Sequence, residues 1–173
     1  MAEAKSDAAR VVAAMVKNKQ TLDLALGKQV AGAIAKSFGV KLEEVAILRL
    51  LPAENLLEFV VPETLARVGT IPLSSTTSLA VRTVRDARAE FLNSFSGARH
   101  HTVFEAVRLS DQQGDPIQKI MSVPVRAGDK VVGAIQVSRK GTTPAASGAD
   151  FTRTSLAALE EVAAVLAQCF PPG

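Results

Sequence analysis

Residues 120–140 read IMSVPVRAGDKVVGAIQVSRK, two mostly apolar runs joined by an Ala-Gly-Asp turn signal. Both runs are rich in β-branched residues, which favours strands, and a short glycine-containing loop between such runs is typical of a β-hairpin. The loop length sets the register, and we expect a three-residue loop over residues 127–129. The pairs that follow are Val125 with Val131, Val123 with Gly133, and Met121 with Ile135.

This register divides the side chains of the hairpin between two faces of different character. One face suits packing under helices and carries Met121, Val123, Val125, Val131, Ile135 and Val137. The other is smaller and more polar and carries Ile120, Ser122, Pro124, Val132, Ala134, Gln136 and Ser138. A two-residue turn would mix the two sets, because a slip of one residue moves a side chain to the opposite face.

The rest of the chain supplies helices at both ends and further strands between them. Hydrophobic periodicity predicts helices over residues 3–19, 21–38 (ended by Gly39), 79–85 and about 152–170, and one around residues 103–109. Strands are predicted over residues 43–51, 55–61 and 89–93, and the segment after Pro62 is expected to be irregular. The serine and threonine residues of TIPLSSTTS can cap the helix that follows them. Hairpins dominate and no βαβ alternation appears, so the prediction is an α+β domain with an antiparallel sheet.

The totals restrict the class of protein. A chain of 173 residues suits one domain, and 47% hydrophobic with 21% charged residues is a globular composition. A net charge of +3 spread along the chain, with neither Trp nor Tyr, argues against nucleic-acid binding. The single cysteine, Cys169, excludes an internal disulfide and a cysteine-based zinc site. No membrane-spanning segment or signal peptide is recognised, and we expect a soluble cytoplasmic protein.

Several stretches together resemble the GAF domain, a sensory fold related to the PAS domains. They are TIPLSS before a short helix, AEFLN as the strand after it, KIMSVPVRAGDKVVGAIQVSRK as the paired strands, and DFTRTSLAALEEVAAVLA as the closing helix. The resemblance implies an antiparallel sheet of about five or six strands. It also implies N- and C-terminal helices on one face and a small-molecule pocket with shorter helices and loops on the other. Residues 21–170 would form the GAF-like domain, and residues 1–20 a helical extension.

The markers of three specialised GAF groups do not match this sequence. Bilin-binding relatives attach their chromophore to a cysteine in the pocket region, where Cys169 does not lie. Relatives that reduce free methionine sulfoxide use several cysteines, and this chain has one. The N-K-F-D-E residue set of cyclic-nucleotide-binding members is not found. The resemblance therefore implies a general sensory role with no cofactor named.

The polar face of the hairpin is the candidate ligand site. The hypothesis is that Ser122 and Gln136 line a pocket that Phe95 and Phe104 help to roof, since ligand sites combine an apolar lining with a few polar groups. The alternative is a face that is simply solvated, as one side of an antiparallel sheet often is. Exposure of Ser122 and Gln136 to bulk water would exclude the pocket.

Other candidates come from the loops and from strand 43–51. Asn93 and His101 are included as ligand-binding residues, His101 because its loop falls where a roof is expected. The adjacent histidines His100 and His101 cannot share a face, so no metal site is predicted. Arg49 interrupts an apolar strand, and it either extends to the sheet edge or neutralises an anionic ligand.

These observations lead to two hypotheses of function. The first is a small-molecule-binding regulatory module that acts as a homodimer through its terminal helices and signals to a separate effector protein. The dimer is inferred from a stripe of Val12, Met15 and Val16, which must be buried somewhere. The second is a ligand-free scaffold of the same fold for dimerisation or protein interaction. A packed face at Ser122, Ala134 and Gln136 would favour the scaffold. No catalytic constellation is found, so no enzyme is predicted.

Overall fold

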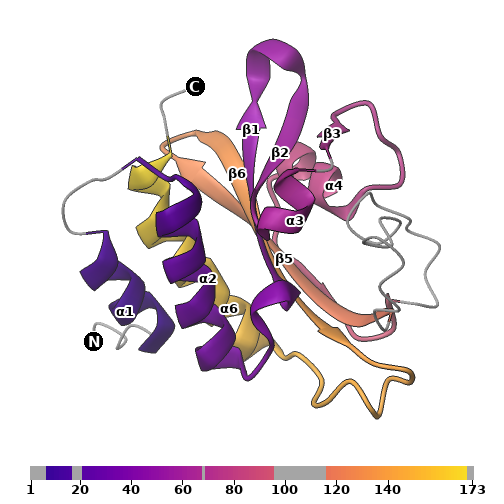
Figure 1. Cartoon of the computed structure of the whole chain (residues 1–173). Coiled ribbons are helices and arrows are strands. Elements are labelled where there is room, and N and C mark those ends of the chain that lie inside the picture. The colour runs from indigo at the N-terminus through magenta and orange to yellow at the C-terminus, as the bar shows by residue number, and fades with distance from the viewer. Residues whose placement is uncertain (1–6, 17–20, 68, 96–115, 171–173) are drawn as a thin grey trace.

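Six antiparallel strands form one sheet in the computed structural model, which describes residues 7–16, 21–67, 69–95 and 116–170 (Figure 1). The strands are β1 (Val45–Leu51), β2 (Leu56–Val61), β3 (Thr70–Pro72), β4 (Glu90–Leu92), β5 (Ile117–Ala127) and β6 (Lys130–Lys140). Their order is β3-β2-β1-β6-β5-β4, so the long hairpin β5–β6 lies between β4 and β1. The predicted α+β class with an antiparallel sheet is confirmed.

The β5–β6 hairpin differs from the predicted register along its length, so none of the three predicted pairs forms. Ala127 pairs with Lys130, so the loop is the two residues 128–129 and not three, with Gly128 at φ +63°. The pairs Arg126 with Val131 and Val125 with Gly133 follow, and Val132 between them has no partner opposite it. Away from the turn, the register joins Val123 to Ile135, Ser122 to Gln136 and Met121 to Val137.

The bulge at Val132 explains why the wrong turn length still gave the correct faces over most of the hairpin. A two-residue turn shifts the pairing by one residue, and the extra residue in β6 shifts it by one more, which restores the alternation. Met121, Val123, Val125, Ile135 and Val137 therefore pack in the helix-side core as predicted. Val132 itself joins that core, contrary to its predicted place on the polar face.

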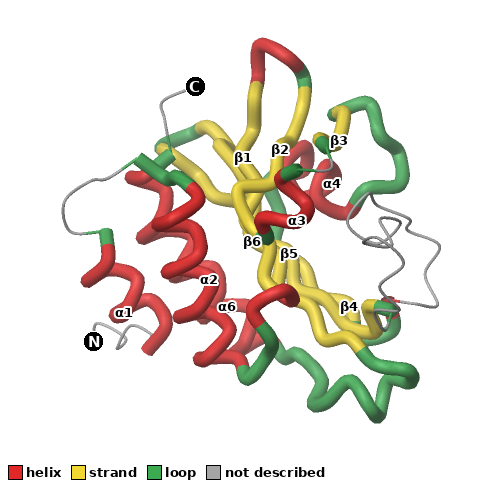
Figure 2. Tube along the Cα trace, viewed as in Figure 1, coloured by secondary structure: helices red, strands yellow, loops and turns green. Residues whose placement is uncertain are grey.

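Two helices, α2 (Leu24–Phe38) and α6 (Arg153–Leu166), cover one face of the sheet, and α1 (Asp7–Met15) packs on both of them (Figures 1 and 2). Helix α2 begins at Asp23, whose side chain accepts from the Leu26 amide, and ends at Gly39 in the left-handed region, as predicted. A Cβ at Gly27 would lie 3.0 Å from the side chains of Val60 and Val61, so this helix packs closely on β2. The Leu22 amide donates to the Cys169 carbonyl at 2.7 Å and joins the start of α2 to the turn after α6.

The apolar stripe of α1 is buried against other helices of the same chain. This stripe was expected to need a second subunit, but Ala8, Ala9, Val12 and Val16 are buried among residues of α2 and α6. The stripe therefore does not need a second subunit to be buried, because helices of the same chain already cover it. Helix α1 thus lies against α2 and α6, farther from the strands than either of them (Figure 2).

Two shorter helices, α3 (Glu63–Ala66) and α4 (Leu79–Asp86), lie on the opposite side of the sheet (Figure 1). Helix α3 and strand β3 occupy the segment after Pro62 that was expected to be irregular. A second buried cluster fills the space beneath these helices and includes Leu48, Leu57, Phe59, Leu65, Ile71, Leu79, Phe95 and Ile120. The sheet therefore separates two apolar cores, as a sheet covered on both faces requires.

Candidate functional site

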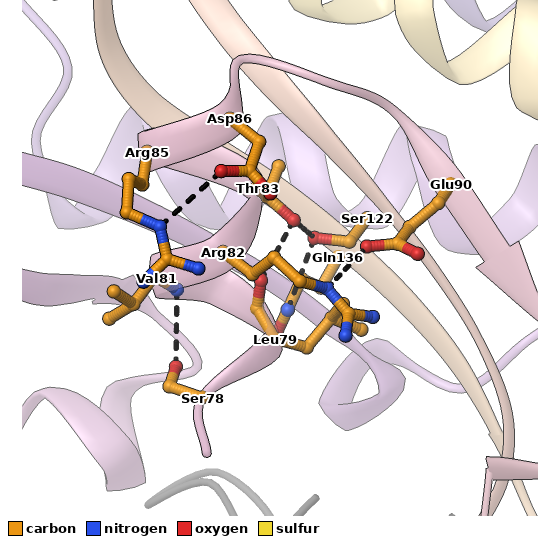
Figure 3. Close-up of polar contacts among 10 residues, drawn as sticks. All are labelled: Ser78, Leu79, Val81, Arg82, Thr83, Arg85, Asp86, Glu90, Ser122 and Gln136. Atoms are coloured by element: carbon orange, nitrogen blue, oxygen red, sulfur yellow. Dashed lines mark hydrogen bonds and ion pairs between the residues drawn. The ribbon is translucent and has the colours of Figure 1, made fainter. Parts of the chain in front are cut away.

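The polar face of the hairpin lies under α4 and is buried, not solvated. Ser122 is 0% exposed and Gln136 is 2% exposed. Gln136 Nε2 donates to Ser122 Oγ at 3.2 Å, and Ser122 Oγ lies 2.6 Å from Thr83 Oγ1 on α4 (Figure 3). The predicted solvated alternative is therefore excluded, because buried polar groups here bond to one another.

These bonds form a directional chain, which we call the α4 relay: Gln136, Ser122, Thr83 and the carbonyl of Leu79. Thr83 Oγ1 donates to the Leu79 carbonyl at 2.9 Å, so its hydrogen is used and its oxygen must accept from Ser122. Ser122 then donates to Thr83 and accepts from Gln136. Each hydroxyl donates one hydrogen bond and accepts one, so the single hydrogen of each is used and one acceptor lone pair on each is left.

Residues at both ends of α4 fix the position of this helix over the relay. The Ser78 hydroxyl accepts from the Val81 amide at 3.2 Å and caps the helix, as predicted for TIPLSSTTS. The helix ends at Ala87, which adopts φ +51°, and the Arg126 side chain donates to its carbonyl. Leu79, Ala80 and Thr83 fall on the buried stripe of this eight-residue helix.

An ion pair closes the outer side of the relay. Arg82 Nε on α4 lies 2.8 Å from Glu90 Oε1 on β4, and Glu90 is the residue opposite Ser122 in the β4–β5 pairing (Figure 3). Their side chains are 27% and 20% exposed, so the pair is half-buried. Helix α4 is thus held to the sheet by a polar chain in the middle and a charged pair at the edge.

The relay itself contains no titratable group. It consists of an amide, two hydroxyls and a backbone carbonyl, so it can donate and accept hydrogen bonds but cannot act as a general acid or base near neutral pH. Within the described ranges, no group of three or more His, Cys, Asp or Glu side chains could hold a metal ion. The arrangement suits recognition of a neutral polar group and does not suit proton transfer.

The structure does not bring Arg49 to this face. Arg49 lies on the helix side of β1, where its Nε donates to Glu58 Oε1 at 2.7 Å and its Nη1 donates to the Leu22 carbonyl at 3.2 Å. It neither extends freely to the sheet edge nor meets Ser122. It pairs with Glu58 across β1–β2 and holds the segment before α2.

Two other predicted residues, Asn93 and Phe95, follow β4 along the chain. Asn93, just after β4, donates through Nδ2 to the Phe151 carbonyl at 3.0 Å and accepts the Phe151 amide at 2.8 Å. Both polar ends of its side chain therefore hold the loop that leads into α6. Phe95 is buried in the cluster beneath α4, which agrees with its expected place beside the polar face. His101 and Phe104 lie outside the described residues.

Cys169 lies on the other side of the sheet. It is buried in the helix-side core, in the turn that follows α6. Burial raises the pKa of its thiol, which lowers the fraction of reactive thiolate.

Thr83 is the member of this site that the sequence reading missed. A signal was present, since LAVRTVRD places Thr83 four residues after Leu79, on the apolar stripe of a short amphipathic helix. A hydroxyl on such a stripe needs a partner on the surface it covers. The serine and glutamine of the polar hairpin face were the available partners.

Comparison with known proteins gives a family and a fold. The model of the family described as GAF domain matches residues 25–170. A GAF domain from an Acinetobacter phosphoenolpyruvate-protein phosphotransferase superposes with a TM-score of 0.69 at 15% identity, covering 94% of this chain and 90% of that one. No curated protein matches the sequence.

Two further solved structures represent different roles of the same fold. A methyl-accepting chemotaxis protein fragment has a TM-score of 0.68 at 14% identity, with 91% of this chain and 93% of that one covered. A free methionine-R-sulfoxide reductase from Neisseria meningitidis, in complex with its substrate, has a TM-score of 0.67 at 12% identity. It covers 95% of this chain and 86% of that one. At these identities the likeness concerns the fold alone.

Proposed function

Because the chain belongs to the GAF domain family, commonly a sensory or regulatory module of signalling proteins, we propose that it regulates a partner through the docking of α4. The observation that carries this proposal is the α4 relay, a set of polar groups at an otherwise apolar interface. A polar interface of this kind offers donors and acceptors that a small molecule with amide or hydroxyl groups can take over. The ligand would exchange its own hydrogen bonds for those between Thr83 and Ser122.

Regulation by such a ligand requires that it bind the two positions of α4 with different affinity. With α4 docked, Thr83 and Ser122 satisfy each other; with α4 displaced, both hydroxyls and the Gln136 amide need new partners. A ligand that supplies those partners favours the displaced position. A separate effector protein that binds α4 or the terminal helices would then respond to the change in their position.

A second candidate, a ligand-free scaffold, is favoured by a specific observation. Ser122, Ala134 and Gln136 are all buried, and the polar groups among them are satisfied by the chain itself. A packed face was the feature expected of a scaffold. Its partner would be a second copy or another protein docked on the exposed side of the helical layer, where Ala13 of α1 and Val165 of α6 line an open hollow.

Native mass spectrometry of the purified protein distinguishes the two candidates. The regulatory proposal predicts a co-purified small molecule on the wild-type chain that is lost in Gln136→Leu and kept in the matched variant Ser138→Ala. Ser138 is buried on the same strand, but its hydroxyl donates to the Glu44 carbonyl and not to the relay. A wild-type chain with no adduct, at twice the 18.2 kDa monomer mass, would support the scaffold. A bare monomer would contradict both the co-purified small molecule and a scaffold made with a second copy.

The chain is proposed to act without catalysis. The fold does include enzymes, as the methionine-R-sulfoxide reductase neighbour shows. This sequence has one cysteine, and Cys169 is buried on the side of the sheet opposite the α4 relay. Incubation with free methionine sulfoxide and a thiol reductant should give no methionine, and turnover would refute the non-catalytic proposal.

A further inference from the structure

A second hollow lies at the other end of the sheet, between the end of α2, the end of β6 and the loop 141–148. It has a volume of about 440 Å³, within the range of small-molecule sites. Its polar lining includes Lys41, Glu44, Arg139, Lys140, Thr142 and Ser147. We call it the basic cavity, because three of these side chains are cationic and one is a carboxylate.

The chain already satisfies the acceptors in this cavity. The Glu44 carboxylate accepts the Lys41 amide at 2.8 Å and the Lys140 amide at 2.6 Å. At the end of α2, the Gly39 amide donates to the Ala35 carbonyl. The lining carries three cationic side chains and one carboxylate, so the cavity has an excess of positive charge.

Arg139 is held in place as a donor. Its guanidinium lies 4.8 Å from the centroid of the Phe151 ring, and its Nη2 donates to the Phe38 carbonyl at 2.9 Å. Its Nε is buried and has no hydrogen-bond partner among the described residues. A buried donor without an acceptor is costly, so the guanidinium of Arg139 keeps unused donor capacity in the wall of the cavity.

The wall formed by loop 141–148 is fixed at both ends. Gln118 donates to the Gly141 carbonyl at 2.9 Å, and Lys119, which is 4% exposed, donates to the Gly148 carbonyl at 2.5 Å. A Cβ at Gly141 would lie 2.7 Å from the Ser147 amide nitrogen, so the loop folds closely back on itself there. The cavity is therefore built before any ligand arrives, which lowers the entropic cost of binding.

We propose that the basic cavity binds the oxyanion group of a small molecule, a carboxylate or a phosphate, at a site separate from the α4 face. Arg139 supplies planar donors, Lys41 and Lys140 supply point charges, and the Thr142 hydroxyl supplies a further donor. This inference is independent of the proposed function, since the α4 relay lies on the opposite side of the sheet from Arg139 and Phe151.

The test is an amide NMR titration with inorganic phosphate and, separately, with succinate, both at constant ionic strength. We expect saturable shifts concentrated at the amides of Lys41, Gly141, Thr142 and Ser147, and unchanged signals at Thr83. The stronger of the two titrants identifies the oxyanion class.

Lys41→Ala should weaken binding about tenfold, or about 1.4 kcal/mol. The matched variant Lys36→Ala removes an exposed lysine from the last turn of α2, outside the cavity, and should change the affinity less than twofold, about 0.4 kcal/mol.

Two outcomes would overturn the proposal. The first is the absence of saturable shifts with either titrant, and the second is equal weakening by Lys41→Ala and Lys36→Ala, which indicates adventitious screening of charge. Arg139→Lys provides a further measurement, because it keeps the charge and removes the Nε donor. We expect it to weaken binding while the chain remains folded, and unchanged affinity would refute the role of the guanidinium.

Discussion

The hydrogen bond between Thr83 and Ser122 makes a quantitative prediction about how α4 is held. Ser122→Ala removes an oxygen that bonds Thr83 at 2.6 Å and Gln136 at 3.2 Å. Each net bond contributes about 1 kcal/mol, and the orphaned Gln136 amide adds about 1 kcal/mol or more. We therefore expect Ser122→Ala to lower the free energy of unfolding by about 3 kcal/mol. Thr83→Val, which keeps the shape of the side chain, should cost about 1–2 kcal/mol.

The double variant tests whether the bond is shared. Each single change removes the Thr83–Ser122 bond, so the sum of the two losses counts it twice. The double variant should be more stable than that sum by about 1 kcal/mol, measured by urea unfolding followed by circular dichroism. Ser138→Ala is the matched partner, because Ser138 is buried on the same face but shares no hydrogen bond with Thr83. Its coupling to Thr83→Val should stay within about 0.5 kcal/mol. Additive losses for Ser122→Ala and Thr83→Val would refute the relay.

Three further predictions concern packing, a loop and the thiol. Gly133→Ala places a Cβ against the Leu48 carbonyl oxygen and 2.5 Å from the ring of Phe170, and it should cost about 3 kcal/mol in thermal unfolding. Adding Phe170→Leu should recover little of this loss, because the contact with the Leu48 backbone remains; an unchanged Tm for Gly133→Ala would contradict this packing. Asn93→Ala removes both hydrogen bonds to the Phe151 backbone and should lower the free energy of unfolding by about 2 kcal/mol. Hydrogen exchange at the Phe151 amide should also become faster. Exchange as slow as in the wild type would show that these bonds are not needed. Cys169, whose pKa is raised by burial, should react with Ellman's reagent at least about 100-fold more slowly in the native protein than in guanidinium, and equal rates would contradict the buried position.

On the polar hairpin face, the sequence predicted which residues lie together but not the length of the turn. Alternation along β5 and β6 was enough to predict that Ser122 and Gln136 share a face. The turn length was wrong, because both a two-residue and a three-residue loop fit Ala-Gly-Asp, and the bulge at Val132 has no clear sequence signal. The faces were still correct because the two single-residue shifts add up to two, which restores the alternation.

Long-range pairing accounts for two arrangements that the sequence did not reveal. Arg49 was expected either to extend to the sheet edge or to neutralise an anionic ligand, but it pairs with Glu58 on the adjacent strand, which periodicity alone does not identify as the opposite residue. The stripe of Val12 and Val16 was assigned to a second subunit because a sequence does not reveal how many helices share one layer. Both predictions needed the tertiary arrangement, which local patterns do not contain.

The bond from the Leu22 amide to the Cys169 carbonyl places the entrance and the exit of the domain at one corner of the fold. Arg49 reinforces this corner from β1, through its bond to the Leu22 carbonyl. A pull or a twist applied to the segment before α2 is therefore applied directly to the end of α6 as well. Because the segment between α1 and α2 is bonded to the turn after α6, a displacement of α2 at this corner should be transmitted to α6 without passing through the sheet.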